Sequence, residues 1–182
     1  MEILFWENED QQLILSSNRS ATAVTSLLAN GHVESLVQDI YPTLAQTGPV
    51  LLRQDRSYLH QIHPDPTGQY LLGLDLGGDM IRVYTFDNAT LKMTELAPLE
   101  TEAGVGPRHG VFWRSPSDVL HYIFVGELSQ KVYTYTITYS SNGLTWTKVA
   151  EIVALGNENE KPATTAPTSE IALSVCQPSL IV

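Results

Sequence analysis

Three side chains in the middle of the chain have the types that proton transfer and anion binding require: His60, Arg108 and Glu127. An arginine can hold a carboxylate or a phosphate through two parallel hydrogen bonds, and it can stabilise negative charge that develops during a reaction. A histidine or a glutamate with a suitably shifted pKa can move a proton, which supplies about 10²- to 10⁴-fold in rate. This chemistry requires a fold that brings the three residues together.

Most of the chain has the pattern of short β-strands separated by turns. The apolar run at residues 69–74 directly follows the turn sequence Asp-Pro-Thr-Gly at 65–68, and residues 131–139 alternate with a period of two. One helix is expected, at residues 33–39. The pattern otherwise predicts an all-β protein.

An internal repeat indicates how the strands are grouped. His60, the turn at 65–68 and the step Asp75-Leu76 recur as His109, a turn at 115–118 and the step Glu127-Leu128, so the histidines lie 49 residues apart and the steps 52 apart. Periods of about 40 to 50 residues are typical of β-propeller blades, and an ordinary meander is the alternative. We predict one partial β-propeller domain over residues 1–182, with blade-like repeats at about 12–55, 56–105 and 106–153, followed by a loop and an incomplete strand at 154–182.

The repeat predicts that the candidate residues lie close together in the folded protein. His60 and Arg108 occupy near-equivalent positions in successive repeats, 48 residues apart. In a propeller the innermost strands and their loops line a central channel, so both side chains are expected at one mouth of it. Glu127 is expected to follow an inner strand and to face the same space.

These motifs resemble the β-propeller lactonase family with seven blades, which includes bacterial 6-phosphogluconolactonases and fungal carboxy-cis,cis-muconate cyclases. The resemblance covers about residues 12–174, and the turn before Thr145-Trp146 is similar to the fungal branch. The matching features are His60 six residues before the proline of a D-P-x-G turn, D-L-G-x-D at 75–79, G-P-R-H at 106–109 and the E-L-S step at 127–129.

The resemblance implies lactone chemistry on a small anionic substrate, without a metal or an organic cofactor. The reaction would be hydrolysis of a sugar lactone or cycloisomerisation of a carboxymuconate. His60, Arg108 and Glu127 match the family's motif positions and are implied as catalytic, and Arg108 and His109 are the candidates for binding substrate. In hydrolysis Glu127 or His60 would activate water. In cycloisomerisation Arg108 would hold the anion while His60 or Glu127 handles the α-proton.

Competing interpretations remain open at the sequence level. The resemblance covers about three blades of the family's seven, and the arginine of an S-N-R motif that completes the family's site has no match. A catalytically inactive truncated fragment and an interaction module that pairs its exposed strand edges are therefore alternatives. Among single residues, His60 could cap a blade edge, Arg108 could form a salt bridge between blades, and Glu127 could turn outward. His63 is expected to face water.

Composition and charge exclude several classes of partner. Ten basic and twenty acidic residues give a net charge of −10, which opposes binding to nucleic acid or an anionic membrane. The single cysteine, Cys176, excludes a disulfide framework and a cysteine-rich zinc site. No apolar run reaches the ~18 residues that span a bilayer, and the acidic start lacks the basic region of a signal peptide. We expect a cytoplasmic protein, or an extracellular one if the true start lies upstream, and its oligomeric state stays open.

Overall fold

The computed structural model describes residues 2–7, 12–18, 21–27, 30–87, 89–141, 143–154, 168–174 and 180–181. Cys176, Asn142 of the turn before Thr145 and residues 155–167 of the expected loop lie outside these ranges. The strands are β1 (Glu2–Glu7), β2 (Gln12–Asn18), β3 (Ala21–Leu27), β4 (Val33–Ile40), β5 (Leu59–Pro64), β6 (Tyr70–Asp75), β7 (Met80–Asp87), β8 (Lys92–Glu95), β9 (Leu99–Glu100), β10 (Pro107–Arg114), β11 (Leu120–Gly126), β12 (Lys131–Ser140), β13 (Gly143–Val153), β14 (Ala172–Leu173) and β15 (Leu180–Ile181). The described residues form no helix, and so none that could cross a membrane; the expected all-β class is confirmed.

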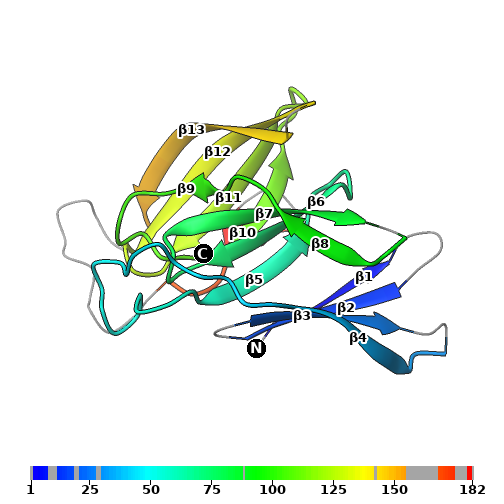
Figure 1. Cartoon of the computed structure of the whole chain (residues 1–182). Coiled ribbons are helices and arrows are strands. Elements are labelled where there is room, and N and C mark those ends of the chain that lie inside the picture. Colours follow the sequence, from blue (N-terminus) through cyan, green and yellow to red (C-terminus); the bar gives the residue numbers. More distant parts are fainter. Residues whose placement is uncertain are drawn as a thin grey trace.

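The strands form three successive antiparallel meanders (Figure 1). Their orders are β1-β2-β3-β4, β5-β6-β7-β8 and β10-β11-β12-β13, so strands adjacent in the chain are adjacent in the sheet. β9 pairs with the part of β7 that β8 leaves uncovered, and β14 pairs with β15. β1 belongs to the first sheet although it precedes the first expected repeat. Three consecutive four-stranded antiparallel meanders are the arrangement of successive propeller blades.

Residues 33–39 form strand β4, so the expected helix is wrong. The apolar residues Val33, Leu36 and Ile40 have a spacing that suits one face of a helix, but Val33 and Leu36 are exposed in the structure. The segment pairs with β3 instead, and Gln38 bonds to both backbone groups of Met93 on β8, with N···O distances of 2.8 and 3.2 Å. Sheet pairing and this contact with the next sheet override the local pattern.

Apolar clusters between successive sheets hold them face to face. The largest joins the second and third sheets and is rich in stacked aromatic rings, with 5.1 Å between the ring centroids of Phe124 and Tyr133. A smaller cluster around Ile62 and Tyr84 joins the first and second sheets, and a third packs Ile171 against the third sheet. Burial of this apolar surface is the main force that fixes the angle between the sheets.

The first strand of each sheet lies toward the inside of the arrangement. β5 contacts β1 and β2 of the first sheet and β10 of the third, and β10 also contacts β6 and β14. Two polar contacts connect β5 to the third sheet: Gly110 N donates to Gln61 Oε1 at 2.7 Å, and His63 Nε2 lies 2.8 Å from Tyr122 Oη. His63 also packs against the rings of Phe112 and Tyr122, so the expectation that it faces water is wrong. Burial lowers the pKa of His63 to about 4.

Candidate functional site

His60 and Arg108 occupy the same place in two successive sheets. Each is the extra residue of a β-bulge, in β5 and β10 respectively. The flanking pairs are Leu59 with Asp75 and Gln61 with Leu74 in the second sheet, and Pro107 with Gly126 and His109 with Val125 in the third. A bulge breaks the alternation of side chains and re-aims the residue that it contains. The strand register therefore gives His60 and Arg108 equivalent positions in their sheets, as their 48-residue spacing predicts.

Glu127 is a buried carboxylate between two arginines. Its side chain is 3% exposed, Oε1 accepts a hydrogen bond from Arg53 Nη2, and Oε2 accepts one from Arg108 Nη1. Its backbone N–H donates to the carbonyl of Gly106 at 2.9 Å, and Gly106 has a φ of 61°, which favours glycine. Glu127 follows β11, the second strand of its sheet, so the expectation that it follows an inner strand is wrong. It does not turn to solvent, since both carboxylate oxygens hold guanidinium groups.

The backbone contacts shift the internal repeat by one residue. Leu76 N–H donates to the carbonyl of Tyr58 at 3.0 Å, as Glu127 N–H does to Gly106, and these two donors lie 51 residues apart. Asp79 and Gln130, also 51 apart, share the left-handed conformation, with φ of 50° and 57°. Glu127 therefore corresponds to Leu76, and the expected match to Asp75 is wrong. The two acidic-Leu steps are alike in sequence, but the hydrogen bonds set the register.

The segment after the third sheet closes one side of this cluster. Arg108 is 26% exposed, and its Nε donates to the carbonyl of Ser169 at 3.1 Å. The neighbouring His109 places Nδ1 2.7 Å from Glu170 Oε2, and the Glu170 side chain is largely exposed. Arg108 thus joins the third sheet to residues 168–174 and also reaches Glu127. His109 is paired with a surface carboxylate.

Arg53 completes the cluster, and no sequence motif marks it. It lies in the loop between β4 and β5, outside every motif of the resemblance, and its side chain is 43% exposed. A charged residue in a polar loop has no periodicity or spacing that would distinguish it from any other surface arginine. Only its contact with Glu127, 74 residues further along the chain, shows that it belongs to the site.

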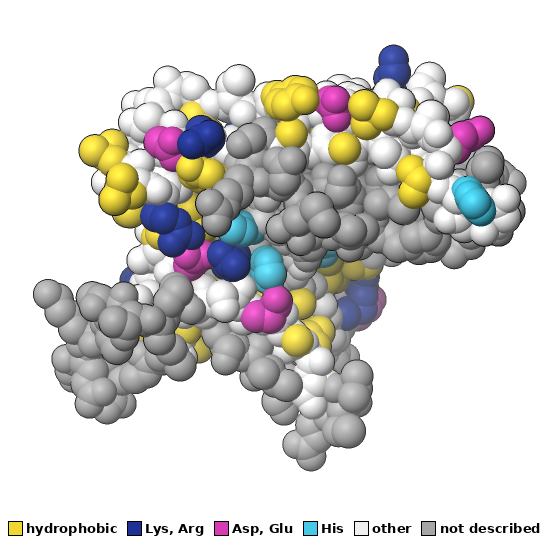
Figure 2. Space-filling model, turned by 90° about the horizontal axis from the view of Figure 1, so that it is seen from below, with side chains coloured by type: hydrophobic (Ala, Val, Ile, Leu, Met, Phe, Trp, Pro, Cys, Tyr) yellow, Lys and Arg dark blue, Asp and Glu magenta, His cyan; other side chains and the backbone are white. Residues whose placement is uncertain are grey.

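His60 is a neutral imidazole beside these charges. Burial first, and then the positive charge of Arg108, lower the pKa of His60 to about 4, and the Glu127 carboxylate opposes both effects. Within the described part of the chain, the His60 side chain makes no hydrogen bond, so the cap of a blade edge considered above is not formed there. Figure 2 shows basic, acidic and histidine side chains gathered near the middle of one face. A cation and an uncharged proton acceptor thus lie in one region.

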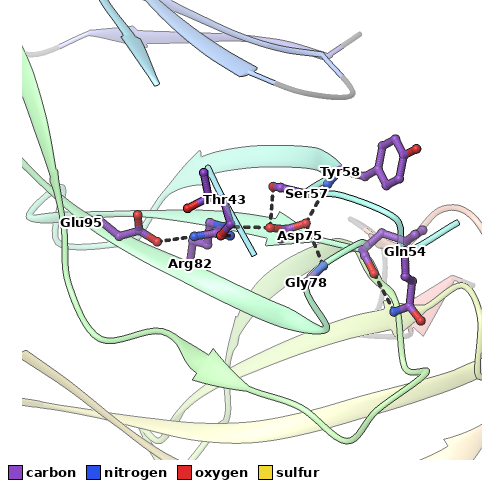
Figure 3. Close-up of polar contacts among 9 residues, drawn as sticks. Thr43, Gln54, Ser57, Tyr58, Asp75, Gly78, Arg82 and Glu95 are labelled. Atoms are coloured by element: carbon purple, nitrogen blue, oxygen red, sulfur yellow. Dashed lines mark hydrogen bonds and ion pairs between the residues drawn. The ribbon is translucent and has the colours of Figure 1, made fainter. Parts of the chain in front are cut away.

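A second arginine–carboxylate cluster lies inside the second sheet and is closed (Figure 3). Asp75 accepts four hydrogen bonds, from Ser57 Oγ at 2.6 Å, Arg82 Nε at 2.8 Å, Tyr58 N at 2.8 Å and Gly78 N at 3.0 Å. Arg82 also donates to Glu95 Oε1 at 2.6 Å and to the Thr43 carbonyl at 3.1 Å. The side chains of Asp75 and Arg82 are 0% and 5% exposed. Because Asp75 and Arg82 are buried and both have protein partners for their charged atoms, this cluster stabilises the fold.

The other acidic residues that the structure describes offer no metal site. Among the described residues, no three His, Cys, Asp or Glu side chains are placed to hold a metal ion. Asp79 uses its two carboxylate oxygens to accept hydrogen bonds from Gly104 N and Gly106 N, both at 2.7 Å. A hollow of about 270 Å³ beside Asp79, between residues 44–49 and 77–80, is lined by no arginine, lysine or histidine. It lacks the cation that lactone chemistry requires.

Comparison with known families and sequences connects the chain to one group. The family model described as "Lactonase, 7-bladed beta-propeller" matches residues 6–182. A protein of Arthroderma benhamiae described as "Probable 6-phosphogluconolactonase" is 31% identical over 147 residues, which are 80% of this chain and 37% of that protein.

Solved structures agree on the fold. A protein from Lactobacillus plantarum superposes with a TM-score of 0.74 at 27% identity, over 92% of this chain and 46% of that one. The periplasmic gluconolactonase of Pseudomonas aeruginosa superposes with a TM-score of 0.71 at 21% identity, over 91% of this chain and 44% of that one. The chain therefore spans less than half the length of the relatives that it matches.

Proposed function

Because this chain belongs to the family of β-propeller lactonases with seven blades, we propose that the protein hydrolyses a small anionic sugar lactone. The observation that carries the proposal is the pair of equivalent bulges, which places an uncharged histidine and an ion-paired arginine in one region. A cation for the developing negative charge and an acceptor for the proton of water are the two groups that this reaction requires.

Arg108 is the residue that stabilises charge. When water attacks the lactone carbonyl, negative charge develops on the carbonyl oxygen, and a guanidinium held in place can stabilise that charge without reorganising. Glu127 and the Ser169 carbonyl hold Arg108 through Nη1 and Nε, respectively. Because both Glu127 oxygens are engaged, the water-activating role that Glu127 shared with His60 at the sequence level belongs to His60. Glu127 is a positioning residue.

His60 is the proton carrier. Its neutral imidazole accepts a proton as water adds to the carbonyl carbon; the ring C–O bond then breaks, and the proton passes to the leaving oxygen, which yields the open hydroxy acid. The charge of Arg108 depresses the pKa of His60. Negative charge that develops on the lactone carbonyl oxygen beside Arg108 offsets that charge, so His60 becomes a stronger base as water adds. Cycloisomerisation of a carboxymuconate would use the same groups and stays a prediction.

The test measures lactone hydrolysis above the spontaneous rate. The purified protein is assayed with 6-phosphogluconolactone and with 3-carboxymuconate, and the variants H60Q and R108Q are expected to lose about 10²- to 10³-fold in kcat/KM. The matched controls are R114Q, which changes an exposed arginine at the other end of β10, and H32Q, which changes an exposed histidine. These should retain activity.

Two results would overturn the proposal. One is a wild-type protein that unfolds cooperatively but hydrolyses neither type of lactone, which would support the inactive alternative. The other is hydrolysis that survives both H60Q and R108Q. Turnover of carboxymuconate without lactone hydrolysis would assign the cycloisomerase reaction instead.

A further inference from the structure

We propose that Arg53 is a specificity residue of this site and binds the anionic group of the substrate, while Arg108 serves the reacting carbonyl. The inference rests on the proposed lactone hydrolysis and adds a residue that neither the motifs nor the family resemblance assigns. It begins from the way two arginines share one acid. Arg53 and Arg108 bond to opposite oxygens of Glu127, so two positive charges and one negative charge leave a net charge of +1.

The surplus charge faces solvent on the Arg53 side. The Arg53 side chain is 43% exposed, against 26% for Arg108, and only its Nη2 is bonded to the protein among the described residues. A guanidinium has five N–H donors in a planar fork, which matches a carboxylate or phosphate group bidentately. Glu127 orients Arg53 and leaves most of this fork available. A surface arginine that served only to neutralise Glu127 would be redundant, because Arg108 already pairs with that carboxylate.

The loop that carries Arg53 is built to hold it in place. Gln54, the next residue, has no exposed surface, which is uncommon for a glutamine. Its Nε2 donates to the Leu76 carbonyl at 3.1 Å, and its Oε1 accepts from Val50 N at 3.1 Å. Backbone bonds from Arg53 N and Gln54 N to the Val50 carbonyl, at 2.7 and 2.9 Å, close the turn.

A glycine lets the turn close around that amide. A Cβ atom added at Gly48 would lie 2.5 Å from Gln54 Oε1, so only glycine fits there without displacing the buried amide. The loop is thereby anchored at Leu76, the counterpart of Glu127 in the second sheet. Arg53 is thus preorganised by its backbone as well as by its ion pair, which lowers the entropy cost of binding a ligand.

The two arginines differ in their relation to the proton carrier. Arg108 occupies the bulge equivalent to that of His60, and it has the larger electrostatic effect of the two on His60, whereas Arg53 has a weaker one. The lactone carbonyl therefore belongs beside His60 and Arg108. Arg53 is left for a compact oxyanion elsewhere on the same substrate, either a phosphate or a carboxylate.

The test separates charge recognition from catalysis. The variants are R53Q, which retains an N–H donor for Glu127, and R53K, which retains the charge but loses the fork. R56Q is the matched control, because Arg56 lies in the same loop and, among the described side chains, contacts only neighbours on its own loop, the exposed Asp55 through an ion pair and the Tyr58 ring at 5.6 Å. The substrates are 6-phosphogluconolactone and the uncharged glucono-δ-lactone.

R53Q is expected to raise the KM for the phosphorylated lactone by about 10- to 10²-fold, the value of hydrogen bonds between charged groups. Its kcat and its KM for the uncharged lactone should stay within about threefold. R53K should lie between R53Q and the wild type, and R56Q should match the wild type. An equal rise in KM for both lactones, or no rise for either, would overturn the proposal.

A second readout does not need activity. Inorganic phosphate and acetate are titrated into the wild-type protein and R53Q by calorimetry, and R53Q is expected to weaken binding of the preferred anion by at least about tenfold. The preferred anion identifies the substrate group as phosphate or carboxylate. Anion binding that depends on Arg53 in a protein without lactonase activity would overturn the proposed function and leave the anion site standing. Anion binding unchanged in R53Q would overturn the anion site itself.

Discussion

Two buried carboxylates in neighbouring sheets hold arginines in opposite ways. Asp75 and Glu127 stand one position apart in the repeat, and both side chains are at most 3% exposed. Arg82, which pairs with Asp75, is 5% exposed, whereas the Glu127 partners Arg53 and Arg108 are 43% and 26% exposed. A buried acid is therefore no sign of a functional site in this molecule. The distinguishing property is a cation that its acid orients and that solvent still reaches.

The two clusters differ in how many arginine N–H donors already have protein partners. In the Asp75 cluster, the Nε, Nη1 and Nη2 atoms of Arg82 all have protein partners. A ligand could bind only by displacing them, and breaking a buried ion pair costs about 3–5 kcal/mol. In the Glu127 cluster the carboxylate is saturated but the guanidiniums are not. An arginine–carboxylate ion pair thus stabilises the fold at Asp75, whereas at Glu127 it leaves guanidinium N–H groups that can bind an anion.

The largest effect on stability is expected from D75N. The amide presents an N–H where the carboxylate accepted hydrogen bonds, and it leaves Arg82 buried without its main counter-charge. We expect unfolding at lower urea, with a loss of about 3–5 kcal/mol. D118N, which changes an acid that is 86% exposed, should lie within about 0.5 kcal/mol of the wild type. Equal losses for the two variants would contradict a structural role for Asp75.

The corresponding acid-to-amide change at the other cluster, E127Q, is expected to lower catalytic activity strongly and the free energy of unfolding only slightly. Arg53 and Arg108 reach solvent and can rehydrate, so the stability loss should be clearly smaller than that of D75N. Arg108 loses its orienting partner, and we expect kcat/KM for the lactone to fall about 10²-fold. Loss of the carboxylate also removes the charge that supports protonation of His60, so the acid limb of the pH–rate profile should move to lower pH. A stability loss equal to that of D75N would remove the distinction.

The two histidines of β5 both have a pKa lowered to about 4, so a bound anion rather than acid alone should separate them. Burial lowers the pKa of His63 in the folded protein from 6.5 to about 4, so the unfolded chain binds the proton more readily than the folded one. The stability that follows from the neutral form is complete above the unfolded pKa of about 6.5 and is lost as the pH falls through the window toward 4. H63Q should lose less stability than the wild type between about pH 7 and pH 5 in urea titrations. An oxyanion beside Arg108 would raise the pKa of His60, whereas His63 lies among packed rings, so an analogue that carries such an oxyanion should shift the titration of His60 and leave the contribution of His63 to stability unchanged.

The smallest effect is expected where charges are most exposed. Lys148 bonds to Glu102 at 2.6 Å and to Glu151 at 2.7 Å, with side chains 33%, 61% and 37% exposed. K148A should lower the free energy of unfolding by less than about 1 kcal/mol, because solvent and salt screen such pairs. Urea titrations at low and high salt measure this, and the difference should shrink at high salt. A loss as large as that of D75N would show that burial does not determine how much the ion pairs of Asp75, Glu127 and Lys148 contribute to stability.

Sequence patterns predict the second and third strands of the last two sheets better than their first strands. Residues 131–139 alternate with a period of two and form β12, and the run at 69–74 forms β6 with a shift of about one residue. The inner strands β5 and β10 contain Pro64, Pro107 and Gly110, together with histidines that contact polar partners. Prolines, a glycine and a bulge interrupt the regular alternation in these two strands, so no pattern marks them.

The candidate site was predictable only in part, because the internal repeat indicates some of its residues and not others. Residue type and the 48-residue spacing led to His60 and Arg108, because equivalent positions of a repeat lie side by side in space. The expected role of Glu127 had to be changed once its two ion pairs were known. Arg53 was not predicted, because a loop arginine has no sequence signature of its partner.

The amino-acid sequence by itself determined the all-β class, the repeat and the residue types of the site, since these depend on local pattern and on internal comparison of one chain with itself. Only the tertiary structure decided the one-residue register that separates Asp75 from Glu127, the strand at residues 33–40, and the convergence of Arg53 and Arg108 on one carboxylate. Register and convergence depend on hydrogen bonds and packing between residues distant in the chain. Such contacts have no local pattern, because they exist only after the sheets have assembled.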